Sequence, residues 1–211
     1  EKNADEIRKL FTPKPPSKKV TPKATKKLIN KKTTTKSTSK KTKATTKKKP
    51  LEKKHMKLAI QAHKKIFGER PNGWYTGRCS PNTRDLVMED GGFLYDSDSY
   101  SDDLPYWETR NKKKQLIIPY TLDNNDMRFA TNQGFNTGDH FFTYLKDSFD
   151  ALYEEGKTSP KMMSVGLHCR LIGRPGRIRS LKKFLDYVLK FEDIWICKRE
   201  DIANYWIKNY S

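Results

Sequence analysis

The stretch GWYTGRCSPNTR, residues 73–84, places a short apolar segment directly before the signals that begin a helix. The aromatic segment 74–76 predicts a strand. Ser80 is of a type that caps helices and Pro81 suits the first helical position, so a helix is predicted from 81 to about 90. The glycines at 91–92 would end it. A strand that turns into a helix in this way is the repeating unit of α/β proteins.

After this unit, strand and helix signals alternate through most of the chain, and one further helix is predicted before it. Apolar periodicity predicts a linking helix over 55–67, closed by Gly68, and a long helix that Thr137 caps and Gly156 ends. Further strands are predicted at 93–95, 115–120, 162–167 and 194–197, an acidic loop at 96–110, and further helices at 178–188 and 201–210. This order predicts a parallel α/β sheet or a barrel.

The N-terminal quarter differs in composition from the rest. Residues 1–58 contain 21 lysines and arginines but only 4 acidic residues, whereas the remainder is nearly neutral. Between residues 12 and 54 the chain consists mostly of Lys, Thr, Ser and Pro, with no aromatic side chain. We therefore expect a disordered low-complexity tail over 1–53 and a folded domain over 54–211. The tail is either a solvated insertion or a lysine arm that contacts polyanions nonspecifically.

Cysteine usage and hydropathy predict the cellular compartment in which the protein resides. Three cysteines without Cys-x-x-Cys spacing do not suggest a disulfide framework, and they fit a reducing compartment. No apolar run approaches the roughly 20 residues of a membrane span, and residues 1–5 lack the apolar core of a signal peptide. The sequence therefore predicts a cytoplasmic protein without a membrane partner.

His168 is the first candidate catalytic residue. It follows the apolar segment 162–167, so it should project from the carboxyl end of a buried strand, where an imidazole can act as general acid or base. The alternative is a core histidine bonded to the backbone. Arg170 and the glycine-flanked basic loop 173–177 follow, and they could hold an anionic or carbonyl-rich ligand or form a solvated turn.

Arg78 and Asp96 follow two other predicted strands. Arg78 precedes a helix N-terminus, so the guanidinium and the free amides could together polarise a carbonyl oxygen. Asp96 follows the strand at 93–95 and could orient or activate another group, while Asp98 reads better as part of a hydrophilic loop. For Arg78 the alternative is a surface arginine beside an ordinary Ser-Pro cap.

The segment after the strand at 115–120 is rich in amide and carboxylate groups. Asn125, Asp126 and Arg128 offer both donors and acceptors, which suits recognition of a urea or imide group. The alternative is that these residues only form a turn. Trp74, on the strand before Arg78, completes the residues expected to contact a substrate. No set of His, Asp and Cys residues has convincing metal-ligand spacing, so no metal site is predicted.

Four segments together resemble one family. GWYTGRCSPNTR (73–84), GFLYDSDSYSDDLPY (92–106), IPYTLDNNDMRF (118–129) and SVGLHCRLIGRPGR (164–177) are similar to the cofactor-independent allantoinases of urate catabolism, within the polysaccharide deacetylase (NodB-homology) superfamily. The resemblance covers about residues 55–210. It implies a distorted (β/α) barrel that opens the ring of allantoin by hydrolysing an amide C–N bond without a cofactor. The superfamily's late histidine motif corresponds to His168, its arginine motif to Arg78 and its Tyr-Asp-Ser segment to 95–97.

The resemblance also implies that something is missing. In the superfamily the first strands bear an acidic catalytic motif and a histidine pair, and here the Lys/Thr tail stands in their place. We therefore expect a partial (β/α) barrel that lacks its first strands and exposes edge strands. Either another chain supplies the missing half, with a homo-oligomer as one such arrangement, or the sequence is a fragment, a mispredicted gene product or a degenerate copy. Two other functions stay open: a non-catalytic remnant with a polyanion-binding arm, and a metal-dependent polysaccharide deacetylase.

Overall fold

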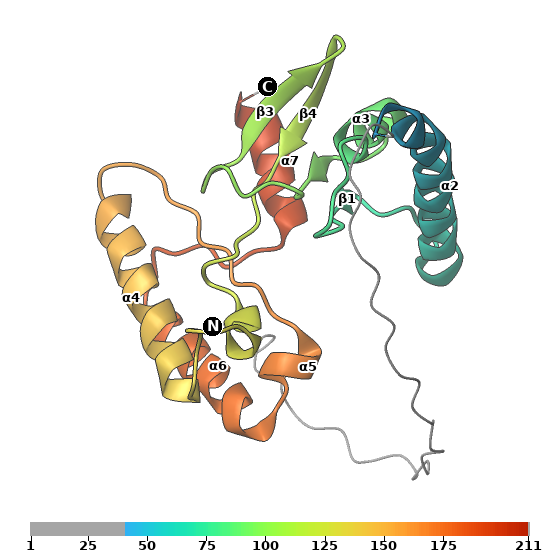
Figure 1. Cartoon of the computed structure of the whole chain (residues 1–211). Coiled ribbons are helices and arrows are strands. Elements are labelled where there is room, and N and C mark those ends of the chain that lie inside the picture. The colour runs from blue at the N-terminus through green and yellow to red at the C-terminus, as the bar shows by residue number, and fades with distance from the viewer. Residues whose placement is uncertain (1–40, 211) are drawn as a thin grey trace, which may run out of the picture. The chain divides into compact units, whose positions relative to one another are not determined.

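The computed structural model describes residues 41–210 (Figure 1). Most of the predicted tail, with its expected disorder and polyanion contact, lies outside the described residues. Helix α2 spans Lys41–Phe67, so it begins well before the predicted residue 55, and 41–53 is helical rather than part of a disordered tail. The low-complexity composition hid this because lysine and threonine carry no apolar periodicity.

A four-stranded mixed sheet lies at the centre of the domain, in the order β1-β2-β4-β3. The strands are β1 Gly73–Trp74, β2 Tyr95–Asp96, β3 Tyr106–Arg110 and β4 Lys113–Ile117. Strands β1, β2 and β4 are parallel, with Trp74 opposite Asp96 and Asp96 opposite Ile117. Strand β3 runs antiparallel to β4, so the α/β prediction is confirmed but the sheet is mixed rather than wholly parallel.

Three predicted segments need correction, one loop and two strands. The segment predicted as an acidic loop over 96–110 contains β3, which forms a hairpin with β4 through Asn111 and Lys112, both with positive φ. The segment at 162–167 has no regular strand and pairs only through an isolated parallel bridge between Asn125 and Gly166. The segment at 194–197 is a loop.

The predicted helices are present, with shifted starts. Helix α3 begins at Thr83 rather than residue 81, with Asn82 at the N-cap position. The Ser80 hydroxyl accepts the Asn82 N–H at 3.0 Å and donates to Glu52 on α2. Gly91 ends α3 with φ +69°, as predicted. Thr137 caps α4 by accepting from the His140 N–H, also as predicted. The remaining elements are α3 Thr83–Asp90, η1 Asp126–Ala130, α4 Gly138–Gly156, α5 Cys169–Ile172, α6 Pro175–Val188 and α7 Arg199–Tyr210.

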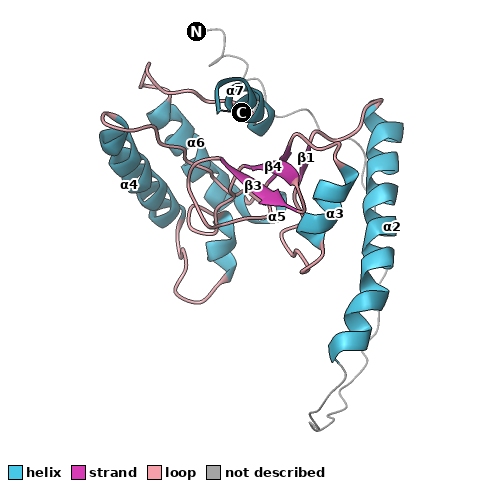
Figure 2. Ribbon diagram, turned by 90° about the horizontal axis from the view of Figure 1, so that it is seen from above, coloured by secondary structure: helices cyan, strands magenta, loops and turns pink. Residues whose placement is uncertain are grey.

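Apolar clusters hold these elements together. In Figures 1 and 2, α4 lies beside α6 and α2 lies beside α3. Phe141 and Leu145 of α4 are fully buried against Leu181 and Phe184 of α6. Met56 of α2 packs with residues of α3, and α7 covers the sheet through Ala203. The clusters flank the sheet and leave the carboxyl ends of its parallel strands for polar groups.

Replacing Phe141 with alanine should lower the free energy of unfolding by about 3–5 kcal/mol, the usual cost of emptying a core ring site. The Phe141 ring is fully buried and meets the rings of Phe129 and Phe135 at 5.5 and 5.4 Å. Urea unfolding measures the loss. Phe67→Ala is the control, because that ring is 66% exposed, and equal losses in the two variants would contradict this packing.

Candidate functional site

The carboxyl ends of β1, β2 and β4 meet at one edge of the sheet, because the three strands are parallel. Backbone bonds extend the pairing beyond the strands: Ile118 N–H donates to Asp96 O and Tyr120 N–H donates to Ser99 O. Arg78 comes shortly after β1 and Asp96 is the last residue of β2. These strand ends therefore form a common edge, at which Asp96 lies.

The Asp126 carboxylate binds His168 at this edge. His168 Nδ1 lies 2.6 Å from Asp126 Oδ1, and the backbone N–H groups of His168 and Ile172 donate to Oδ2 at 2.8 and 3.0 Å. Asp126 is fully buried, while the His168 side chain stays partly exposed. Three N–H groups around one carboxylate fix the ring's position. An ionised Asp126 accepts a hydrogen bond from Nδ1–H, and in that tautomer of the neutral ring Nε2 carries the lone pair.

Asn125 and Arg128 have structural partners. Asn125 Oδ1 caps η1 by accepting from the Met127 N–H, and its Nδ2 donates to the Thr121 carbonyl. The Arg128 guanidinium lies over the rings of Phe135 and Tyr144 and is 3.4 Å from Asp123. These contacts match the turn alternative for both residues, and their substrate-binding roles stay predictions.

Asp96 is buried in an ion-pair network. Its Oδ2 lies 2.8 Å from Arg84 Nε, and Arg84 also pairs with Glu108 at 2.7 Å. Asp96 Oδ1 accepts the Asp98 N–H. Burial outweighs these favourable contacts and raises the pKa of Asp96 to about 6. The group is thus placed to hold the end of β2 and the start of α3 together.

Folding stability should depend on the Asp96 proton. Since its pKa is about 6 in the fold and 3.8 ordinarily, the folded chain binds more protons, and the free energy of unfolding falls as the pH rises from about 4 to about 6. Above that range this contribution is constant. Urea unfolding from pH 4 to 7 should show a shallower decline for Asp96→Asn than for the unchanged protein. Parallel pH profiles would show that Asp96 does not titrate as described.

Asp98 holds the loop that carries Arg78, a role that the sequence did not indicate. Its carboxylate accepts the N–H groups of Thr76 and Gly77 at 3.0 and 2.8 Å and the Thr76 hydroxyl at 2.8 Å. The loop predicted to be merely hydrophilic therefore contains a buried anchor. Among the side chains of residues 49–210, none forms a hydrogen bond or ion pair with the exposed guanidinium groups of Arg78 and Arg170, so both stay available to a ligand.

Trp74 lies in the apolar cluster of α2 and α3. Its ring meets Phe93 at 5.3 Å, and its buried indole N–H has no acceptor among the residues described. This is a packing position, and the substrate-binding role of Trp74 stays a prediction.

Arg199, at the start of α7, contacts several strand ends, a role that was not predicted from the sequence. Its guanidinium donates to the carbonyls of Ile118 and Pro119 at 3.0 Å and to the hydroxyls of Ser97 and Ser164 at 3.2 and 3.0 Å. Burial lowers the pKa of this arginine. No local signal could have revealed it, because its partners lie 35 to 102 residues away.

Comparison with known proteins identifies the relatives of this fold. A protein of Schizosaccharomyces pombe (strain 972 / ATCC 24843), named "Putative polysaccharide deacetylase", is 46% identical over 172 residues, which are 74% of this chain and 54% of that protein. The crystal structure of a "probable Polysaccharide deacetylase" from Pseudomonas aeruginosa PAO1 is 58% identical with a TM-score of 0.74, covering 76% of this chain and 54% of that one. This chain belongs to the polysaccharide deacetylase superfamily.

Another solved superfamily structure is named Puue allantoinase. It is 58% identical, has a TM-score of 0.75 and covers 76% of this chain and 54% of that one. A polysaccharide deacetylase-like structure from Mycobacterium smegmatis, at 23% identity and a TM-score of 0.65, shares the fold alone. No family model matches. The chain spans about half the length of the relatives it matches.

A metal-dependent deacetylase would need at least three metal-binding side chains close together. Between residues 41 and 210, no three His, Cys, Asp or Glu side chains gather closely enough to hold an ion. The Asp126–His168 pair offers two such groups, which does not match a three-ligand site.

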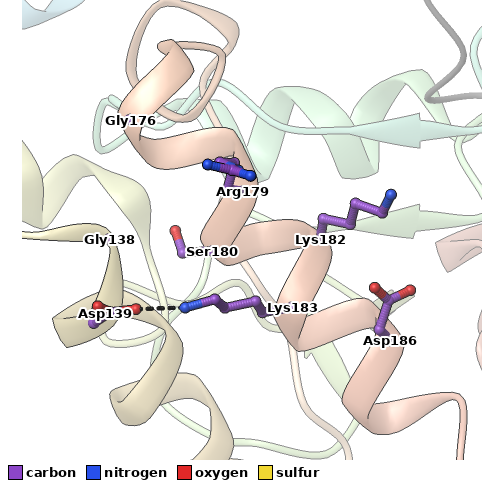
Figure 3. Close-up of a pocket in the computed structure, with 8 residues that line it drawn as sticks. All are labelled: Gly138, Asp139, Gly176, Arg179, Ser180, Lys182, Lys183 and Asp186. Atoms are coloured by element: carbon purple, nitrogen blue, oxygen red, sulfur yellow. Dashed lines mark hydrogen bonds and ion pairs between the residues drawn. The ribbon is translucent and has the colours of Figure 1, made fainter.

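Two further features concern the described chain outside the site. None of the helices that the structure describes is long and apolar enough to cross a bilayer. Figure 3 shows an open pocket at the starts of α4 and α6, lined by Arg179, Lys182 and Lys183 among others, where Lys183 pairs with Asp139 at 2.8 Å. This pocket contains none of the candidate site residues, so it is separate from the strand-end site.

Proposed function

We propose that this chain carries the proton-transfer half of a hydrolase site that cleaves amide C–N bonds, with allantoin as the preferred substrate. The observation that supports this most directly is the buried Asp126 carboxylate bound to His168 Nδ1 at 2.6 Å. The pair lies beside the carboxyl ends of parallel strands, where α/β proteins bind ligands.

In this mechanism His168 is the general acid or base. With the Nδ1 proton directed at Asp126, Nε2 can take a proton from an attacking water and return it to the leaving nitrogen. Asp126 holds the ring in this tautomer and stabilises the imidazolium that forms. The unpaired Arg78 guanidinium can approach the substrate carbonyl and stabilise its developing negative charge. Asp96 acts through Arg84, by holding the strand end in place.

The choice of allantoin rests on the 58% identity to the allantoinase structure. Ring opening of allantoin to allantoate is hydrolysis of a cyclic amide, and the strand-end site offers the general base and carbonyl anchor that such a step needs. The same identity to a structure named polysaccharide deacetylase supports a second candidate, removal of acetyl groups from N-acetylated sugars. Both reactions cleave an amide, so the roles of His168 and Arg78 are the same in each.

Turnover assays of the purified full chain separate these candidates. Allantoin, with allantoate measured as product, should be hydrolysed faster than N-acetylglucosamine oligomers, with acetate measured as product. Faster release of acetate would favour the deacetylase. Absence of turnover with allantoin, hydantoins and N-acetyl sugars alike would refute catalysis by this chain.

A further inference from the structure

Three tyrosines stand together at the strand-end edge, and neither the catalytic roles above nor the relatives' names assign them a task. Tyr75 follows β1, Tyr100 follows β2 and Tyr120 follows β4. The ring centroids of Tyr75 and Tyr120 are 4.6 Å apart, those of Tyr100 and Tyr120 are 6.2 Å apart, and the hydroxyls of Tyr75 and Tyr100 are 3.2 Å apart. We call these three residues the tyrosine cluster.

Polar contacts of Asp98 and Arg199 fix the position of the tyrosine cluster. The Asp98 carboxylate fixes the backbone at Thr76 and Gly77, directly after Tyr75. The Arg199 guanidinium lies 5.5 Å from the Tyr120 ring centre and donates to the carbonyl of the preceding Pro119. Because both anchors are charged groups with several partners, the cluster is preorganised rather than loosely placed.

The cluster lies next to the Asp126–His168 pair. A Cβ on Gly166 would come within 2.6 Å of the Tyr120 hydroxyl and 2.3 Å of Asn125 Nδ2, so the Tyr120 hydroxyl sits directly against Gly166. Gly166 is two residues before His168 and accepts the Asp126 N–H at 2.9 Å. A ligand that lies on the cluster would therefore be close to the His168 imidazole.

The exposed surface of the cluster suits a flat ring that carries amide groups. Tyr75 is 47% and Tyr100 is 44% exposed, although aromatic rings of this size usually bury most of their surface. In the hydroxyl pair of Tyr75 and Tyr100 one group donates and the other accepts. A ring amide presents an N–H and a C=O side by side, which complements such a pair. Burial and the contact with Tyr100 raise the pKa of Tyr75, so its hydroxyl keeps its proton for donation.

We propose that the tyrosine cluster is the platform on which the flat ring of a cyclic ureide or imide lies, with its reacting carbonyl toward His168 and Arg78. This deepens the proposed function and rests on it for the position of the reacting bond. It makes the tyrosines determinants of substrate class: a flat ring amide is preferred over an N-acetylated sugar, whose ring is puckered and whose amide lies outside it.

Equilibrium binding of hydantoin and of N-acetylglucosamine oligomers to the full chain tests the proposal. Calorimetry should show hydantoin binding that weakens by about tenfold or more in Tyr75→Ala and Tyr100→Ala, the usual effect of losing a stacking ring. Tyr75→Phe keeps the ring and should lose less. Tyr205→Ala is the matched control, because Tyr205, on α7, is 51% exposed but packs against Trp195, away from the cluster residues. Near-ultraviolet circular dichroism confirms that each variant is folded.

Each outcome bears on the platform separately from catalysis. Tyrosine-dependent hydantoin binding without turnover would support the platform and refute the hydrolase. Turnover of allantoin with KM unchanged in both alanine variants would refute the platform and leave the hydrolase standing. Absence of hydantoin binding to the unchanged chain, or tighter tyrosine-dependent binding of the sugar oligomers, would also overturn the proposal.

Discussion

Replacing His168 with alanine should lower kcat/KM for allantoin by about 10²- to 10⁴-fold, the usual contribution of a positioned general acid or base. The loss should fall on kcat, because the imidazole is expected to act in the proton-transfer step and not in binding the ring. The side chain is partly exposed at the site edge. Its removal should therefore change the urea midpoint much less than a core substitution does. Steady-state kinetics of the full chain measure the effect.

His140→Ala is the matched control for this variant. His140 is an exposed histidine in the first turn of α4, and its backbone N–H, not its imidazole, donates to the Thr137 hydroxyl. Its kinetics should equal those of the unchanged protein. If His168→Ala retained full kcat, the imidazole would serve only as a structural partner of Asp126, and the role assigned to it would be wrong.

Replacing Asp126 with asparagine should reduce kcat by a similar factor of about 10² to 10⁴. The loss should arise because the His168 tautomer changes, not because the fold of the site changes. The amide keeps one acceptor oxygen, whereas the carboxylate accepts three N–H groups from His168 and Ile172. One of these donors would face the new NH2 group, so the ring would turn or take its proton on Nε2. Stability should fall as well, because Asp126 is fully buried.

Asp123→Asn serves as the control for Asp126→Asn. Asp123 is exposed and contacts Tyr144 and Arg128, so its loss should leave kcat nearly unchanged. A fall in kcat of equal size in both variants would point to a general effect of negative charge in this loop. An unchanged kcat in Asp126→Asn would show that the pair does not move protons.

Local signals in the sequence predicted the helices better than the strands. Thr137 and Gly91 act as the caps that their side chains and positions predict, because capping depends on residues within one turn. The β3–β4 hairpin was missed, since its turn uses Asn111 and Lys112 rather than an Asn-Gly pair, and its alternation was read as a polar loop. The segments at 162–167 and 194–197 have strand composition but gain no regular partner strand.

The site was predictable in its residue types and not in its contacts. Strand-end reasoning brought His168 and Asp126 into consideration, but their pairing across 42 residues needed the fold. Asp98 was read as a solvated loop residue, and only the structure shows its carboxylate beneath the loop at 76–77. Arg199 and the tyrosine cluster gather from separate elements, so no spacing in the sequence could have indicated them.

The position of the ring proton on His168 tests the central claim most directly. In mildly alkaline buffer, ¹⁵N chemical shifts of the imidazole distinguish the two neutral tautomers. We expect the proton on Nδ1, hydrogen-bonded to Asp126, with Nε2 unprotonated. In Asp126→Asn we expect a shift toward the other tautomer. A proton found on Nε2 in the unchanged protein would contradict the claim, because no lone pair would then face a substrate.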